Sequence, residues 1–146
     1  MMRYASLALR AALGLTYLYS VADRFGLLGP PGATGVSWGA FSRFTAYVGT
    51  LNWFAPHALV PAIAWGDTAL EIFLGAALLL GVWLRPVAIV SALLLLAFAA
   101  TMGIASGIGA PFQYSVFTAA AASFMLAAAD SGAERRISLP TGPLKQ

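Results

Sequence analysis

The sequence predicts an all-α membrane protein, a bundle of four transmembrane helices with a short amphipathic interfacial helix in its first outer loop. Hydrophobic residues make up 60% of the 146-residue chain and charged residues only 9%, far below the roughly 25% charged residues of soluble domains. Four apolar segments each approach the ~20 residues that cross a bilayer. The basic residues gather at segment ends, where they act as topology signals, so nucleic acid is not an expected partner.

The predicted spans cover residues 5–22, 61–84, 86–102 and 111–129 of a single membrane domain. The first outer loop is residues 25–60, and a cytoplasmic tail occupies residues 130–146. The last three spans begin at prolines: Pro61, Pro86 and Pro111. Proline suits the first helical position because its missing N–H would have no partner within the helix.

Basic residues fall unevenly on the two sides of this arrangement. One side carries Arg3, Arg85, Arg135, Arg136 and Lys145. The other carries only Arg24 and Arg43. The positive-inside rule therefore predicts a multi-pass protein of a bacterial-type cytoplasmic membrane, with both termini in the cytoplasm.

The first span also has features of a secretory signal. Residues 20–22, Ser-Val-Ala, loosely resemble a cleavage site. However, Arg10 interrupts the apolar core that a signal peptide requires, so we expect the first span to be retained.

The outer loop contains one helical pattern. Ser37 is a candidate cap for a helix that places Phe41, Phe44, Val48 and Leu51 on one face. Further aromatic residues accompany this stripe: Trp38, Tyr47, Trp53 and Phe54. A helix at the membrane interface would explain both features, either as a stabilising lid or as a gate over a pocket.

Two carboxylates interrupt the second span. Asp67 and Glu71 are four residues apart, which places them on one face of one helix. A carboxylate near the bilayer centre costs roughly 2.5 kcal/mol or more, so such groups face a bundle interior or a wet cavity and have partners. These two residues are the expected functional site.

Depth counting at ~1.5 Å per residue indicates which groups meet these carboxylates. Glu71 lies roughly 19 Å and Asp67 roughly 25 Å from the cytoplasmic end of their span. The residues expected at these levels are Arg24, Tyr17, Gln113 and Tyr114. Asp23 is a candidate competitor for Arg24. Arg10 lies only ~8 Å from the cytoplasmic end, well below Glu71, and is expected to snorkel to headgroups.

This constellation can bind a polar head group or handle protons, and a quinone head group is the expected ligand. A structural interpretation has equal weight, because a buried Asp–Arg pair and a Glu bonded to Tyr can hold helices together in lipid. The chain has no cysteine and one histidine, His57. We therefore expect no metal site and no intrinsic cofactor.

Several segments resemble the DoxX/DoxD-like membrane family. Residues 65–86 resemble its core motif, with Glu71, Gly75, Gly81 and Arg85 in the recurring order. Further similar segments are residues 10–14, 52–56, 111–120 and 132–139, the last followed by Pro140 in place of the usual aspartate. The resemblance implies a four-helix bundle whose relatives include subunits of quinone-linked oxidoreductases. It marks Glu71 as a motif position and Gly14, Gly75, Gly81 and Arg85 as structural.

Together these features predict a DoxX-like accessory subunit of a quinone-linked membrane oxidoreductase system, embedded in lipid and able to associate with redox subunits or with itself. Two alternatives remain open. A small proton-coupled transporter would use Asp67 and Glu71 as its carboxylate site, and inverted repeats, which the sequence does not show, would favour it. A purely structural or assembly subunit would use the same residues to hold the helices together.

Overall fold

The computed structural model describes residues 2–137, and side chains over residues 3–129. Within this range the chain forms helices and no strand, so the all-α class is confirmed. The elements are α1 (Met2–Arg24), α2 (Phe41–Leu51), the 3-10 turn η1 (His57–Leu59), α3 (Val60–Leu80), α4 (Leu84–Ser106), α5 (Gly109–Gln113) and α6 (Val116–Ile137).

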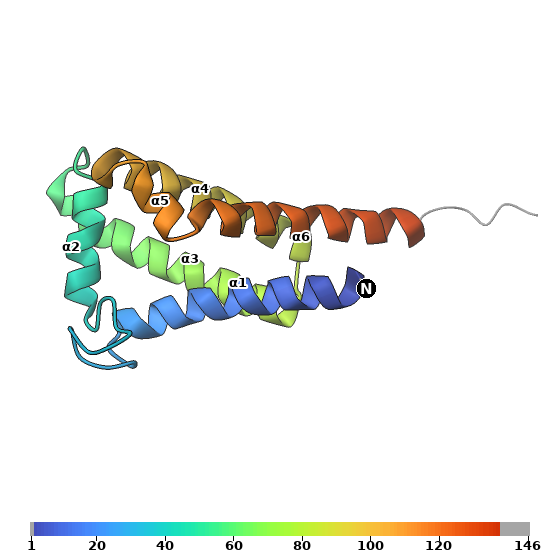
Figure 1. The fold of residues 1–146 in the computed structure, drawn as a ribbon, viewed down its shortest axis with the longest axis horizontal. Helices are drawn as coiled ribbons and strands as arrows, with labels where there is room; N and C mark the ends of the chain where they lie inside the picture. Colours follow the sequence, from blue (N-terminus) through green and yellow to red (C-terminus); the bar gives the residue numbers. More distant parts are fainter. Residues whose placement is uncertain (1, 138–146) are drawn as a thin grey trace, which may run out of the picture.

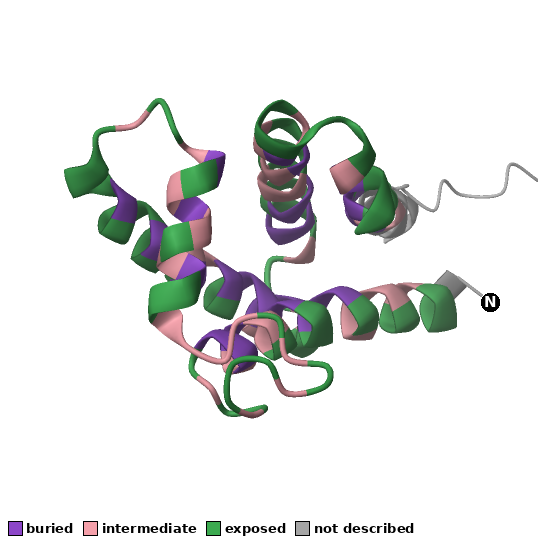
Figure 2. Cartoon of the chain, turned by 60° about the vertical axis from the view of Figure 1, so that its left-hand side comes forward, coloured by how far each residue is buried: buried purple, intermediate pink, exposed green. Residues whose placement is uncertain are grey.

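The long helices α1, α3, α4 and α6 run along the length of the molecule, and α2 lies across one end of them (Figure 1). We call this the α2 end. The start of α1 and the far end of α6 lie at the opposite end (Figure 1). Buried positions lie on the inner faces of the helices, and exposed positions face outward (Figure 2).

Membrane-spanning character is confirmed for part of the predicted set. Three helical segments in the described residues are long and apolar enough to cross a bilayer: Arg3–Arg24, His57–Leu80 and Leu84–Ser106. The fourth, Val116–Ala129, is a shorter apolar helix. A fourth span therefore stays a prediction. The expected tail at residues 130–146 overlaps α6 as far as residue 137, and the rest of it lies outside the described residues.

The second predicted span, residues 61–84, extends beyond the observed end of α3. α3 stops at Leu80, because Gly81 adopts a left-handed conformation with φ of 74°. The amides of Gly81 and Val82 both donate to the carbonyl of Ala77, at 2.8 and 3.1 Å. Glycine takes this conformation without steric cost, and it commonly ends helices in this way.

The start of the last predicted span was also wrong. Pro111 belongs to the short helix α5. Ser115 has a positive φ of 54°, which interrupts the helical path before α6 begins at Val116. A left-handed residue cannot continue an α-helix. Gln113 and Tyr114 consequently lie at the end of α5 and not within the last long helix, which was expected to contain them.

The bundle consists chiefly of two packed pairs, α1 with α3 and α4 with α6. The first pair meets at Gly14 and Gly75. A Cβ atom on Gly14 would lie 3.0 Å from the carbonyl oxygen of Gly75, and one on Gly75 would lie 3.1 Å from that of Gly14. The two backbones are therefore in direct contact, which only the smallest residue permits.

The predicted helix in the first loop is present as α2, and its own residues Phe44, Val48 and Leu51 are buried. Ser37 does not cap it, contrary to expectation, because the helix begins at Phe41 and follows Ala40. The buried stripe packs α2 against α3 and α4 and joins the two helix pairs at this end of the molecule.

Candidate functional site

The arginine that ends α1 lies in the interior of the bundle. Arg24 is 2% exposed. Its Nη1 is 3.1 Å from Oδ2 of Asp67, and its Nη2 is 2.8 Å from Oε2 of Glu71. The helical repeat places both carboxylates on the face of α3 that receives this guanidinium. We call Arg24, Asp67 and Glu71 the charged cluster.

Further side chains from three helices hold the guanidinium in place. Nη1 donates to the hydroxyl of Thr68 at 3.1 Å, and Nη2 donates to that of Ser20 at 3.2 Å. The ring of Phe44 on α2 lies 3.7 Å from the guanidinium carbon. This cation–π contact seats α2 directly over the charged cluster.

The charged cluster is not balanced. It contains one cation and two carboxylates, so its formal charge is −1 when all three groups are ionised. Oε2 of Glu71 and Nε of Arg24 are buried without a hydrogen bond of good geometry from the described residues. The short Glu71–Arg24 contact is thus an ion pair without a well-aligned hydrogen bond, which satisfies a buried acceptor only partly.

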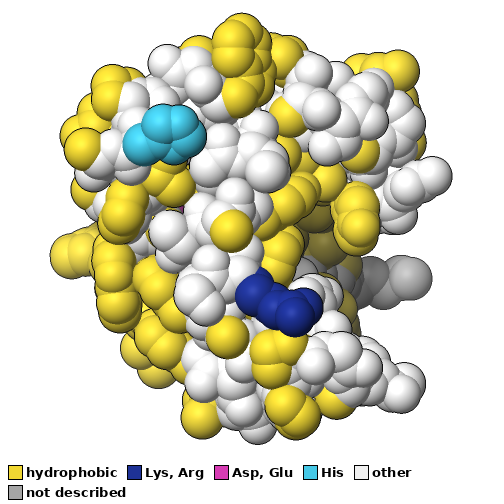
Figure 3. Space-filling view, turned by 90° about the vertical axis from the view of Figure 1, so that its left-hand side faces the viewer, with side chains coloured by type: hydrophobic (Ala, Val, Ile, Leu, Met, Phe, Trp, Pro, Cys, Tyr) yellow, Lys and Arg dark blue, Asp and Glu magenta, His cyan; other side chains and the backbone are white. Residues whose placement is uncertain are grey.

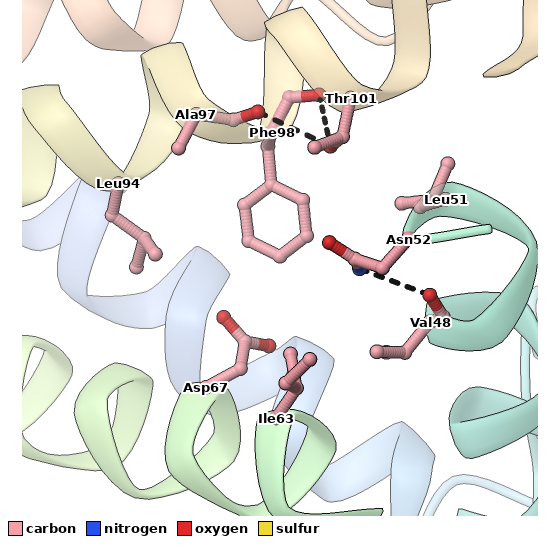
Figure 4. Close-up of a pocket in the computed structure, with 9 residues that line it drawn as sticks. All are labelled: Val48, Leu51, Asn52, Ile63, Asp67, Leu94, Ala97, Phe98 and Thr101. Atoms are coloured by element: carbon pink, nitrogen blue, oxygen red, sulfur yellow. Dashed lines mark hydrogen bonds between the residues drawn. The ribbon is translucent and has the colours of Figure 1, made fainter. Parts of the chain in front are cut away.

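A cavity of about 120 Å³ adjoins the charged cluster between α2, α3 and α4 (Figure 4). Its lining residues are Val48, Leu51, Asn52, Ile63, Asp67, Leu94, Ala97, Phe98 and Thr101. The carboxylate of Asp67 points into this space, opposite the ring of Phe98 (Figure 4). It is the only charged group among the lining residues.

Asp23 has a separate structural role and does not compete for Arg24. Its carboxylate is 2% exposed and accepts the backbone amides of Ser37, Trp38 and Gly39, at 2.9, 3.0 and 3.2 Å. These contacts fix the loop that leads into α2. The sequence expectation of a competition with Asp67 and Glu71 is wrong, because three backbone donors occupy this carboxylate.

Tyr17 lies deeper in the bundle and bonds to other partners. Its hydroxyl is 2.8 Å from the hydroxyl of Ser91, which is 3.0 Å from that of Ser123. Ser123 donates onward to the carbonyl of Ala119 at 3.0 Å. This chain links α1, α4 and α6, so Tyr17 makes its hydrogen bonds there and not to the carboxylates.

Gln113 and Tyr114 lie away from the charged cluster. Both are exposed, and no hydrogen bond or ion pair within the described residues joins either to the cluster. The break at Ser115 explains this placement. Tyr114 instead lies near Tyr47 on α2, and burial together with this second phenol raises the pKa of Tyr47.

Arg10 has protein partners at the end of α3, and its predicted contact with lipid headgroups stays a prediction. Its Nε and Nη2 donate to the carbonyls of Leu78 and Leu79, at 2.9 and 3.1 Å. These are carbonyls of the last turn of α3, which have no partner within the helix. A cation at a helix C-terminus is also favoured by the helix dipole. Arg10 therefore secures the end of α3 and the turn at Gly81.

His57 lies in η1 and is exposed. Figure 3, which looks onto the α2 end, shows a histidine side chain at the surface, bordered by hydrophobic side chains and by backbone or uncharged polar atoms. Within the described part of the chain, no group of three or more His, Cys, Asp or Glu residues is arranged to hold a metal ion.

Sequence reasoning missed the neutral residues around the charges. Ser20 stands four residues before Arg24 and Thr68 stands three residues before Glu71, so helical spacing could have placed both. No comparable signal existed for Phe44, Asn52 or Phe98. They reach the site only through the packing of α2 and α4 against α3.

Comparison with known protein families gives a match over most of the chain. The model of the family described as "Methylamine utilisation protein MauE" matches residues 2–113, more than half of the chain. No curated protein and no solved structure matches. The resemblance to the DoxX/DoxD-like family is therefore wrong. Its motifs consisted mainly of Gly, Ala and Leu in apolar helices, a pattern that helix packing favours in many membrane proteins.

Proposed function

The chain belongs to the MauE family of methylamine utilisation proteins, and on this basis we propose that it is an accessory membrane protein of a methylamine utilisation system. The match from residue 2 to residue 113 is the observation that carries the proposal. It includes the whole charged cluster and every residue that lines the adjoining cavity. The proposed working part of the protein is therefore the α2 end.

An accessory role suits the chemistry that the chain itself carries. It has no cysteine, and its one histidine is exposed on η1. Thiol–disulfide exchange and thiolate-bound clusters are thus beyond its own side chains. Electron transfer in such a system would belong to partner subunits, and this chain would support them from within the membrane.

The distribution of exposed arginines supports one orientation in the membrane. Arg24 is buried in ion pairs, so Arg43 is the exposed arginine of the α2 end within the described residues. Arg3, Arg10 and Arg85 lie toward the opposite end of the bundle. By the positive-inside rule, we propose that the α2 end, with its cavity, lies on the non-cytoplasmic face.

The size of the cavity beside Asp67 does not favour the expected quinone. Pockets that enclose drug-sized ligands measure about 300–1,000 Å³, whereas the cavity beside Asp67 measures about 120 Å³. A proton-coupled transporter is not favoured by any contact in the described residues.

Growth complementation tests the proposal. A methylamine-utilising host that lacks its own MauE-family gene should grow on methylamine as sole nitrogen source when it expresses this chain. The variant Glu71→Gln should restore growth less well. Arg43→Gln is the matched control, because Arg43 is an exposed charge at the same end. Failure of the wild-type chain to restore growth, while immunoblots find it in the membrane, would overturn the proposal.

A further inference from the structure

The cavity beside Asp67 has a chemical character that its lining defines. From it we infer that this cavity binds a small primary ammonium ion, and the proposed function supplies methylammonium as the candidate. The inference rests on the proposed function only for that choice of ion. The charge, the hydrogen-bonding groups and the size of the cavity carry the rest.

The first argument is charge. Arg24 compensates one of the two carboxylates, and within the described residues no second basic side chain pairs with Asp67 or Glu71. An uncompensated negative charge inside an apolar bundle is costly. A bound monovalent cation removes that imbalance. A bound proton would do so as well, but it would leave the other acceptors of the cavity unused.

The second argument is the direction of the hydrogen-bonding groups. Oδ2 of Asp67 accepts from Arg24, whereas Oδ1 accepts no hydrogen bond from the described residues. A side-chain N–H of Asn52 donates to the carbonyl of Val48 at 2.9 Å, and the amide oxygen of Asn52 faces the cavity (Figure 4). The hydroxyl of Thr101 donates to its own helix, to Ala97 and Phe98, both at 3.1 Å.

The carboxylate of Asp67 and the amide oxygen of Asn52 therefore present acceptors to the cavity (Figure 4). An alkylammonium ion carries three N–H donors and no acceptor, which is the complementary set. A carboxylate, a phosphate or a quinone carbonyl would place further acceptors against the oxygen atoms of Asp67 and Asn52. The side-chain carboxylate of Asp67 is only 10% exposed, so an ion bound there would be largely withdrawn from water.

The third argument is the apolar wall and its size. The ring of Phe98 projects into the cavity between Asp67 and Asn52 (Figure 4). An aromatic face attracts a cation, and Ile63 and Leu94 complete an apolar surface for an alkyl group. A cavity of roughly 150 Å³ holds benzene. A cavity of about 120 Å³ accordingly suits a smaller molecule such as methylammonium.

The test is a titration of the full-length protein in lipid nanodiscs with ¹³C-methylammonium, followed by ligand-detected NMR. We expect saturable binding that the neutral analogue methanol and the bulky tetramethylammonium ion do not compete away. Asp67→Asn should weaken binding by about tenfold or more, because a charge-assisted hydrogen bond is lost. Arg43→Gln should bind as the wild type does.

A second variant keeps the test informative if Asp67→Asn does not fold. Leu94→Phe fills the cavity without touching the charges and should abolish binding while the melting temperature is kept. The absence of saturable binding to the wild type, or unchanged binding by both variants, would overturn the inference. Stronger binding of n-butylammonium than of methylammonium would also overturn it, by pointing to a lysine side chain of a partner protein.

The two proposals fail separately. Growth complementation without methylammonium binding would overturn the cavity assignment and leave the accessory role intact. Binding without complementation would do the reverse, since the cavity chemistry would stand without the proposed physiological role.

Discussion

Arg24 and Glu71 are joined by a 2.8 Å contact between Nη2 and Oε2 in the interior of the bundle, and this contact is an ion pair without a well-aligned hydrogen bond. Arg24 is the last residue of α1, and Glu71 lies near the middle of α3. The pair therefore ties α1 to α3 while leaving an acceptor partly satisfied. Substitution of Arg24 and substitution of Glu71 should therefore change the stability of the protein by different amounts.

Removal of the cation should be the more harmful change. Arg24→Gln leaves Asp67 and Glu71 four residues apart on α3 with no counter-charge in the described residues. Loss of one partner of a buried ion pair costs about 3–5 kcal/mol. Glu71→Gln instead leaves one balanced Arg24–Asp67 pair and should change stability by about 1 kcal/mol or less. Thermal unfolding followed by tryptophan fluorescence measures both.

The double variant Arg24→Gln/Glu71→Gln serves as the control for this comparison. It should be more stable than Arg24→Gln alone, because one of the two stranded charges is gone. Equal melting temperatures for Arg24→Gln and Glu71→Gln would contradict the unbalanced cluster.

The crossing of α1 and α3 gives a prediction with an internal control. Gly75→Ala would place a Cβ atom 2.9 Å from Cγ of Leu18 and 3.1 Å from the carbonyl oxygen of Gly14. Overpacking of this kind costs about 1–3 kcal/mol. Gly66→Ala lies on the same helix with nothing within 4 Å of the added carbon. It should leave stability unchanged or raise it slightly. Melting temperatures that fall equally for both variants would contradict the close approach.

Asp23 should control the order of the loop before α2. Asp23→Ala removes the charged acceptor of the Ser37, Trp38 and Gly39 amides, and a hydrogen bond to a charged group contributes about 1.5–3 kcal/mol. Hydrogen–deuterium exchange should accelerate in a peptide that covers these residues. Ser42→Ala, an exposed position at the same end, is the control. Unchanged exchange in Asp23→Ala would show that the loop is held by other contacts.

The hydroxyl chain from Tyr17 should couple two helices energetically. Tyr17→Phe removes a bond to Ser91 and should cost about 0.5–1.5 kcal/mol. In a double-mutant cycle with Ser91→Ala, the two effects should fall short of additivity, because they remove the same contact. Tyr19→Phe is the matched control, since this tyrosine is 56% exposed. A Tyr17→Phe effect no larger than that of Tyr19→Phe would contradict the coupling.

Some parts of the site followed from helical periodicity. Asp67 and Glu71 share a face because they are four residues apart, and a rise of ~1.5 Å per residue brings Arg24 to their level. The same count failed for Gln113 and Tyr114. It assumed one continuous helix from Pro111, whereas Ser115 adopts a left-handed conformation that interrupts it. A single φ angle is not encoded in hydropathy.

Other parts depended on contacts between helices distant in the chain. Asp23 and Arg24 are neighbours with identical depth, yet one turns to loop amides and the other to α3. Arg10 has the long charged side chain of a headgroup anchor, and its hydrogen bonds go to carbonyls at the end of α3 that have no partner within the helix. Side-chain direction at such positions follows from which donors and acceptors the fold brings within reach.

The sequence by itself determined that this protein is helical and membrane-embedded, and that it buries two carboxylates on one helical face. Composition and periodicity suffice for these properties, because they depend on each segment separately. Only the tertiary structure decided that Arg24 is shared between both carboxylates, that Phe44 covers it, and that Asp67 faces a cavity with Asn52 and Phe98. Those relationships depend on how α2 and α4 pack against α3, and no local sequence pattern specifies that packing.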